Sequence, residues 1–346
     1  MATLLYLVHG AAVQQQQQLS YSVLSALKHG VDGVDLVLIC DAANRRPDLP
    51  LRHVVISPEQ IAQWTDGGRR PARAQLHALD LALRETGGPV CWASTDSAFT
   101  AAPARLLERI TPETPLFFDR DGWLTSRPEW SPIIDACKDS ALSEQIQPST
   151  EVFDTGILGL SPSDLGFINR SLNPSEWAQS PYLVDNFEQI HLCALLAQNA
   201  QKLRFSHDLV QRYQGYMQHV YQGRLEAMFP PGGAVNTALA AQLPAITEPP
   251  KPLHLRLKAK AYALRRGLGH GTEFGYLAYL CAFAAPTPEG RNVWANIALD
   301  MMERSARAPQ KLVKDLSNLA PEALPDAELS PQTEERWRRY WMNAGL

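Results

Sequence analysis

Short apolar runs alternate with longer amphipathic segments through the first two-thirds of the chain. This alternation is typical of βαβ units and predicts an α/β fold with a mostly parallel sheet and helices on both of its faces. The runs rich in β-branched residues give the expected strands, which are Leu4–Val8, Asp35–Cys40, His53–Ile56, Val90–Ala93, Leu116–Phe118 and Ile157–Leu160.

Two segments between these strands have helical periodicity. In residues 19–28 the apolar side chains recur every three or four positions, and residues 71–84 show the same spacing. Pro71 suits a first helical turn, because no backbone N–H is needed there. The two expected apolar stripes consist of Leu19, Val23, Leu24 and Leu27, and of Leu76, Leu79 and Leu83.

The composition changes after Phe229. Residues 230–252 are rich in proline and glycine, which predicts a linker without regular structure. We therefore divide the chain into a catalytic domain (1–229), this linker (230–252) and a helical C-terminal region (253–346). Further helices are expected at 273–284 and 292–304. An earlier helical stripe, expected to pack on the catalytic domain, consists of Leu257, Ala261, Leu264 and Leu268.

Overall composition narrows the function classes. The formal net charge of −4 gives no indication of nucleic-acid binding. The five cysteines are far apart and form no metal-binding motif, so we expect reduced, mostly buried thiols. The apolar run near the N-terminus is too short for a signal peptide or a spanning helix. The expected location is the cytoplasm.

A carboxylate follows the expected strand at Val90–Ala93. In an open α/β sheet, ligands bind outside the carboxyl ends of the strands, so Asp96 is placed to hold a divalent cation against a diphosphate. The alternative is that Asp96 only caps the helix expected at 103–110.

A second polar segment precedes the last expected strand. It reads Phe153-Asp154-Thr155-Gly156-Ile157. Together with Ser94-Thr95-Asp96, it resembles GT-A glycosyltransferases, including their glycogenin-like branch. Those enzymes carry an Asp-x-Asp motif at the end of one strand and a Phe-Asn-(Ser/Ala)-Gly-(Val/Ile) strand later. The resemblance spans roughly residues 3 to 229, and Asp154 stands where the family has asparagine.

The resemblance implies a GT-A fold and a nucleotide-sugar site. Asp96 matches the carboxylate that ligates Mn²⁺ or Mg²⁺, whereas Ser94 replaces the other carboxylate of the motif. Because a serine hydroxyl supplies no charge, this departure leaves open a weak-metal or metal-free enzyme. Ser94 is retained as a candidate for contact with the ribose or with a metal-bound water.

Two later segments fit the same family scheme. Residues 182–191 resemble the acidic segment beside the sugar, and the resemblance implies catalytic roles for Asp185 and Asp154. Asp185 alternatively belongs to an ordinary acidic first helical turn. Residues 218–224 resemble the late histidine-containing segment, with His219 as a metal ligand and Arg224 meeting the diphosphate. The alternative for His219 is a surface or packed histidine.

The nucleotide itself is expected at the first two strand ends. His9 and Gly10 follow the first strand, and Asp41 follows the second, where the family seats the base and ribose. Arg69, Arg70 and Arg73 precede or open a helix placed to face phosphates, and Arg73 is the candidate. The alternative is that these arginines are only solvated.

The expected function is transfer of a sugar from a nucleoside diphosphate sugar, of the uridine type, to a hydroxyl of a glycan or lipid-linked acceptor in bacterial glycan synthesis. The main alternative is a GT-A-like binding protein that has lost catalysis, motivated by Ser94. An α/β-hydrolase would need a G-x-S-x-G pentapeptide, and a dinucleotide oxidoreductase a G-x-G-x-x-G; the sequence contains neither in the required place. The basic residues at 256–266 suggest peripheral contact with the inner face of a membrane or with a lipid-diphosphate acceptor. The alternative is a solvated basic face with no partner.

Overall fold

The computed structural model describes residues 2–10, 13–126, 130–138, 140, 142–173, 186–267, 270–306 and 329–343. It divides into two compact units. The first contains residues 1–212 and 231–243, and the second contains residues 213–230 and 244–346.

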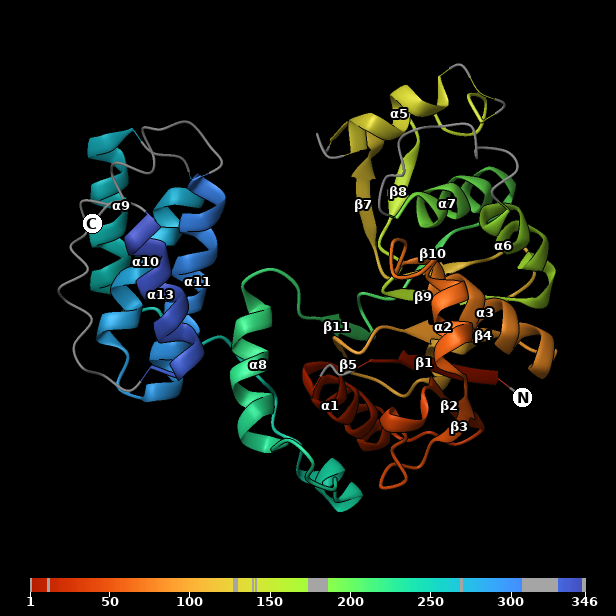
Figure 1. Cartoon of the computed structure of the whole chain (residues 1–346), viewed down its shortest axis with the longest axis horizontal. Helices are drawn as coiled ribbons and strands as arrows, with labels where there is room; N and C mark the ends of the chain where they lie inside the picture. Colours follow the sequence, from red (N-terminus) through yellow and green to blue (C-terminus); the bar gives the residue numbers. More distant parts are fainter. Residues whose placement is uncertain are drawn as a thin grey trace. The chain divides into compact units, whose positions relative to one another are not determined.

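The first unit is built on a seven-stranded sheet with the order β3-β2-β1-β4-β9-β6-β10 (Figure 1). Strands β3, β2, β1 and β4 are parallel to one another, and β9 runs antiparallel to both β4 and β6. The strands are Ala2–Val8 (β1), Val34–Cys40 (β2), Arg52–Val55 (β3), Val90–Ala93 (β4), Leu116–Phe117 (β6), Ile157–Leu160 (β9) and Arg204–Phe205 (β10).

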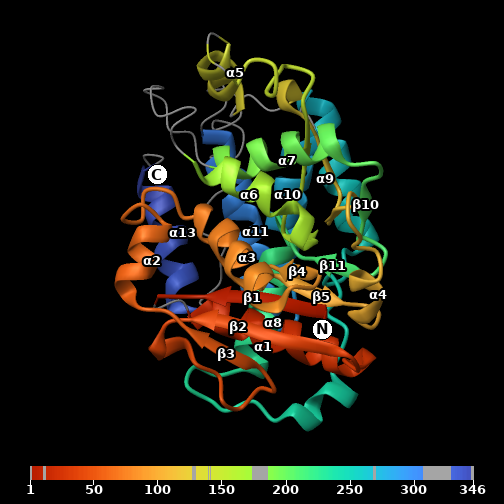
Figure 2. The ribbon, with the colours of Figure 1, turned by 90° about the vertical axis from the view of Figure 1, so that its right-hand side faces the viewer.

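Helices cover both faces of this sheet. Figure 2 shows α3, α6 and α7 on one face and α1 on the other. The helices of the first unit are Val13–His29 (α1), Pro58–Trp64 (α2), Arg73–Thr86 (α3), Ala104–Leu107 (α4), Ser131–Cys137 (α5), Leu165–Leu172 (α6) and Phe187–Asn199 (α7). Short 3₁₀ helices lie at Ala42–Asn44 (η1), Leu124–Ser126 (η2), Pro162–Asp164 (η4) and Thr237–Gln242 (η6).

Successive side chains of β1 point to opposite faces of the sheet, and both sets are buried. Leu5 packs in the same cluster as Leu76 and Leu79 of α3. Its neighbour Tyr6 points to the opposite face, where its hydroxyl is 3.0 Å from the hydroxyl of Ser22 in α1. Both faces of β1 are therefore covered, which explains why its sequence is almost continuously apolar.

Two small antiparallel sheets complete the first unit. Ser97–Phe99 (β5) pairs with Val210–Arg212 (β11), and Arg120–Trp123 (β7) pairs with Glu151–Phe153 (β8). None of these four strands was predicted, and neither was β10, because runs of two to four residues carry too little alternation to stand out.

The second unit is helical. Its described helices are Met217–Met228 (α8), Leu253–Arg266 (α9), His270–Ala284 (α10), Pro288–Ala306 (α11) and Pro331–Asn343 (α13). Helix α10 packs against both α9 and α11. No helix among the described residues is long and apolar enough to cross a membrane.

The boundary between the two units along the chain differs from the one predicted at Phe229. Helix α8 belongs to the second unit because it packs on α11. Residues 231–243 belong to the first unit: the backbone N–H of Val235 donates to Asp48, and Lys28 donates to the carbonyl of Leu243. The expected linker also holds regular structure, namely η6. Proline content indicated irregular backbone but could not indicate what that backbone packs against.

Within the second unit, α9 does not pack through the stripe that the sequence predicted. Leu257 is 60% exposed and Leu264 is 74% exposed. The buried face instead consists of Leu255, Ala259 and Ala263. Two of these three residues are alanines, whose small side chains let α9 approach α10 closely. The ring centroids of Tyr262 in α9 and Tyr276 in α10 are 4.3 Å apart. Leu268, the last member of the expected stripe, lies outside the described residues.

Other expected helices are present, although some of their bounds differ. Helix α1 starts six residues earlier than expected, at Val13, and α3 two residues later, at Arg73. The expected helices near 273–284 and 292–304 are α10 and α11. All five cysteines are free and buried.

Candidate functional site

The carboxyl ends of β1, β2 and β4 lie at one edge of the sheet, as predicted. Val8 pairs with Cys40, and Leu5 pairs with Trp92, in parallel register. The chain continues from β1 to β2 and β3 on one side, while β4 adds on the other side of β1. Such a reversal of strand order is where ligands bind in open α/β sheets.

Hydrogen bonds join the loops that follow β1 and β2 at this edge. The backbone N–H of Gly10 donates to Asp41 Oδ2 at 2.8 Å, and Asn44 Nδ2 donates to the carbonyl of Gly10 at 2.7 Å. Gly10 has φ +79°, a left-handed conformation that glycine adopts without strain. The half-buried His9 precedes it. Asp41 therefore joins the loops after β1 and β2.

Asp41 is held as a carboxylate. It caps η1, with Oδ1 accepting both the backbone N–H and the side-chain amide of Asn44 at 2.9 and 2.8 Å. Burial raises the pKa of Asp41, but the hydrogen bonds from Gly10 and Asn44 outweigh burial and lower it below its usual value. Beside it, burial and the charge of Asp41 raise the pKa of the Cys40 thiol to about 11, so this thiol is no thiolate nucleophile.

The turn after β4 lies at the same edge, on the other side of β1. The backbone N–H of Ser94 donates to the carbonyl of Gly156 at 2.7 Å. The hydroxyl of Thr95 donates to Gln18 Oε1 at 3.1 Å, which ties the turn to α1. Ser94, Thr95 and Asp96 are all partly exposed.

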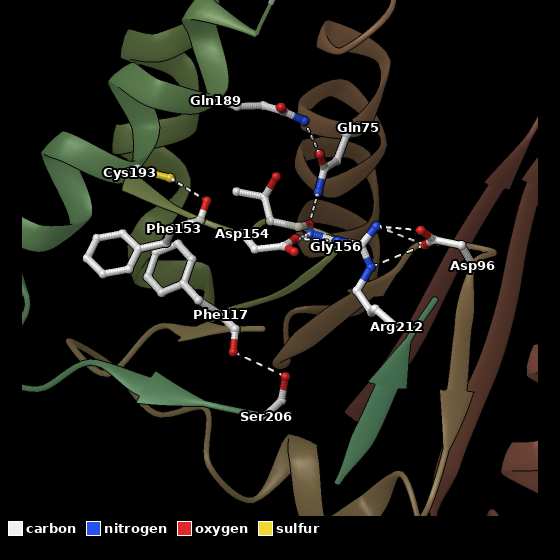
Figure 3. A network of polar contacts seen from close by, with 11 residues as sticks. Gln75, Asp96, Phe117, Phe153, Asp154, Gly156, Gln189, Cys193, Ser206 and Arg212 are labelled. Atoms are coloured by element: carbon white, nitrogen blue, oxygen red, sulfur yellow. Dashed lines mark hydrogen bonds and ion pairs between the residues drawn. The ribbon is translucent and has the colours of Figure 1, made fainter. Parts of the chain in front are cut away.

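Arg212 lies between the two carboxylates that sequence analysis singled out (Figure 3). Its Nη2 donates to both oxygens of Asp96 at 2.9 and 2.7 Å, and its Nε lies 3.2 Å from Asp96 Oδ1. Its Nη1 donates to Asp154 Oδ1. The side chain of Arg212 is only 9% exposed, against 20% for Asp96 and 16% for Asp154.

Local backbone structure explains why Arg212 reaches this place. Arg212 pairs with Ser97 in the β5–β11 sheet, directly beside Asp96. A Cβ atom on Gly156 would lie 2.0 Å from the guanidinium carbon, so only glycine leaves room for Arg212. The glycine of the Phe153–Ile157 segment is thus needed for side-chain packing.

The cluster remains charged. Burial lowers the pKa of Arg212, but attraction to Asp96 and Asp154 outweighs burial and raises that pKa above its ordinary value. The three groups together carry a formal charge of about −1, from two carboxylates and one guanidinium. Carboxylates at the rim of such a cluster are acceptors for hydrogen-bond donors.

A chain of amides extends the cluster to α3 and α7. Gln75 Nε2 donates to the carbonyl of Thr155 at 2.7 Å, and Gln189 donates to Gln75 (Figure 3). The backbone N–H of Gly156 donates to Asp154 Oδ1 at 2.8 Å. The segment 154–156 is therefore fixed from three directions.

Arg73 contacts a buried carboxylate. Its Nε lies 3.2 Å from Glu188 Oε1 in α7, and Arg70 forms an ion pair with the same oxygen. Glu188 is 2% exposed. Arg73 thus joins α3 to α7, an arrangement that the sequence did not predict because Glu188 lies far along the chain.

The residues present do not fit a bound divalent cation. Both oxygens of Asp96 accept from Arg212, and Ser94 offers only a hydroxyl. Among the described residues, no group of three or more Asp, Glu, His or Cys side chains is placed to hold a metal.

The two candidates on α8 have partners within the second unit. His219 Nε2 is 2.6 Å from Asp300 Oδ2, and Arg336 donates to the other oxygen of Asp300 at 2.6 Å. Burial raises the pKa of Asp300, but these hydrogen bonds lower it to about 2. Arg224 forms an ion pair with Glu289. Histidine 219 is therefore a packed histidine in this structure.

Of the two candidate catalytic carboxylates, Asp154 is in the Arg212 cluster, and Asp185 lies outside the described residues. Sequence reasoning missed Arg212, Gln75 and Gln189. Only the register of the short strand β11 reveals Arg212, and no pattern in the sequence indicated that register.

No protein-family model matches the chain, and no curated protein matches it by sequence.

Proposed function

We propose that the chain is a GT-A-type glycosyltransferase, which binds a nucleoside diphosphate sugar at the carboxyl edge between β1 and β4 and transfers the sugar to a hydroxyl of a glycan or lipid-linked acceptor. One observation carries the proposal: the reversal of strand order brings the Gly10 loop, the Ser94–Asp96 turn and the Arg212 cluster to the same edge.

The phosphates would lie against the start of α1. This helix begins five residues after β1 ends, so its N-terminus lies at the same edge. Its first turn contains no acidic residue, which leaves the partial positive charge of the helix N-terminus available for an anion. A Cβ atom at Gly10 would meet no atom within 4 Å, which leaves open space over this backbone.

The sugar would lie at the carboxylates. Ionised Asp96 and Asp154 only accept hydrogen bonds, and sugar hydroxyls supply the matching donors. Arg212 holds both carboxylates in a fixed geometry, so binding would need little reorganisation. Because the side chains around Asp96 do not fit a metal, we assign no step to one.

Calorimetric titration of the full chain with uridine, guanosine, adenosine, cytidine and thymidine diphosphates and their sugar conjugates tests the proposal. At least one sugar nucleotide should bind without manganese and release its sugar in a coupled hydrolysis or transfer assay. Asp96→Asn should weaken binding or turnover about tenfold or more, since it removes one charged hydrogen-bond partner.

Asp208→Asn is the matched control, because Asp208 pairs with Arg109 in the same unit in a similar bidentate contact but is 52% exposed. Its binding and turnover should equal those of the wild type. The absence of binding to every nucleotide in the panel, with and without manganese, would refute the proposal.

A second candidate is a sugar-nucleotide-binding protein without catalysis. It is favoured by the contact of Arg212 with both oxygens of Asp96, because a carboxylate that already accepts these hydrogen bonds is less available for a catalytic role. Binding without release of sugar in the presence of varied acceptors would support this candidate over the enzyme.

A further inference from the structure

Helix α9 presents a ridge of leucines to solvent. Leu253, Leu257 and Leu264 are 67%, 60% and 74% exposed. They are four and seven residues apart, a spacing that places them in one row along the helix. Scattered single exposed leucines are ordinary, whereas a row of three on one helix indicates an interaction surface.

The ridge lies opposite the face that α9 uses for packing in its own unit. That packing face consists of Leu255, Ala259 and Ala263, which are all buried. At 3.6 residues per turn these three residues project from the other side of the helix. The ridge is therefore a second apolar face.

Positive charge flanks the ridge on both sides. On a helical projection, Arg256 and Lys260 lie along one flank, and Lys258 and Arg265 lie along the other. All four side chains are exposed. The sequence contains no Asp or Glu between residues 249 and 272, although the whole chain carries a net charge of −4.

We propose that α9 docks the protein on an anionic lipid bilayer, lying in the plane of the membrane surface. The leucine ridge would enter the boundary between headgroups and acyl chains, and the flanking cations would extend to the anionic headgroups. A bilayer satisfies both features at once, because it offers apolar depth and negative charge side by side. The inference is independent of the function proposed for the first unit.

Co-sedimentation of the full chain with vesicles tests this proposal. We expect binding to phosphatidylcholine vesicles that contain phosphatidylglycerol, weaker binding at higher salt, and none to pure phosphatidylcholine. The double substitution Leu257→Gln and Leu264→Gln should weaken binding about tenfold or more, because it removes apolar side chains that insert. Replacing Lys258 and Arg265 with glutamine should weaken binding and reduce its dependence on salt.

Matched controls come from exposed residues of the first unit. Leu239→Gln replaces a leucine that is 43% exposed, and Lys202→Gln replaces an exposed lysine; neither should change vesicle binding. Circular dichroism should show the same helix content in all variants.

Four outcomes would overturn the proposal. Wild-type protein could remain in the supernatant with anionic vesicles, or the leucine variant could bind as the wild type does. Wild type could bind duplex DNA as tightly as vesicles, which would assign the cations to a polyanion. Finally, the leucine substitutions could abolish self-association in ultracentrifugation or strongly destabilise the fold, which would mean that protein covers the ridge.

Discussion

Helices α3 and α9 carry similar rows of leucines but place them oppositely. In α3, Leu76, Leu79 and Leu83 are at most 1% exposed and pack against the sheet. In α9, Leu257 and Leu264 are mostly exposed, and the small Ala259 and Ala263 make the packing contact instead.

The difference shows what helical periodicity specifies. Periodicity identifies residues that share a face, and the neighbouring surface decides whether that face is covered. Helix α3 has one apolar face and a sheet beside it. Helix α9 has two apolar faces, and the face with the smaller side chains is the one that packs in its own unit. Two measurements test this contrast between the helices, and a third tests a buried histidine of the first unit.

The largest effect is expected from truncating one leucine in each helix. Leu79→Ala in α3 should lower the free energy of unfolding by about 2–5 kcal/mol, because it leaves a cavity beneath the sheet. Leu257→Ala in α9 should change it by no more than about 0.5 kcal/mol, since that side chain is already exposed. Urea unfolding curves measure both. Equal losses would contradict the contrast between the helices.

Acid should destabilise the first unit through a buried histidine of α7. His191 is fully buried, with Nε2 2.7 Å from Gln145 Oε1. Burial, aided by the charge of Arg170, lowers its pKa from 6.5 to about 4. The unfolded chain therefore takes up this proton first as the pH falls, so stability is lost from pH 6.5 down to about 4.

The loss from His191 should be on the order of 3 kcal/mol over this range, because a tenfold change in proton affinity between the folded and unfolded chain corresponds to about 1.4 kcal/mol. Urea unfolding at several pH values gives the slope for the wild type and for His191→Gln, whose side chain can still bond to Gln145. The variant should show a smaller slope between pH 6.5 and 4. An identical slope would show that His191 does not titrate as described.

A smaller effect is expected from enlarging the packing face of α9. Ala259 is 1% exposed in the second unit. Ala259→Leu should cost about 1–3 kcal/mol, because the added methyl groups have no space against the neighbouring helix. The exposed Ala261→Leu is the control and should leave thermal unfolding nearly unchanged. Equal melting temperatures for the two variants would contradict the assignment of Ala259 to the packing face.

Much of the first unit could be predicted from its sequence. All six expected strands are present, and the bounds of Val90–Ala93 and Ile157–Leu160 agree to the residue. The expectation that Asp41 and Asp96 follow parallel strands at one edge is confirmed. These features depend on local alternation and on the short connections of βαβ units, which a sequence displays directly.

The partners of the candidate site residues could not be predicted. Arg212 reaches Asp96 from 116 residues away, and Glu188 meets Arg73 from 115 residues away, so no local spacing relates them. The pairing of Arg212 depends on the register of two three-residue strands and on the missing side chain at Gly156.

Sequence alone predicts the α/β character of the first unit, the strand ends that carry polar residues, and which residues of each helix share a face. Three features appear only in the folded chain: Arg212 forms ion pairs with Asp96 and Asp154, His219 contacts Asp300, and the leucines of α9 are exposed to solvent. The physical reason is range: backbone periodicity acts over a few residues, whereas charge pairing and the covering of a face depend on surfaces that meet only after the chain has folded.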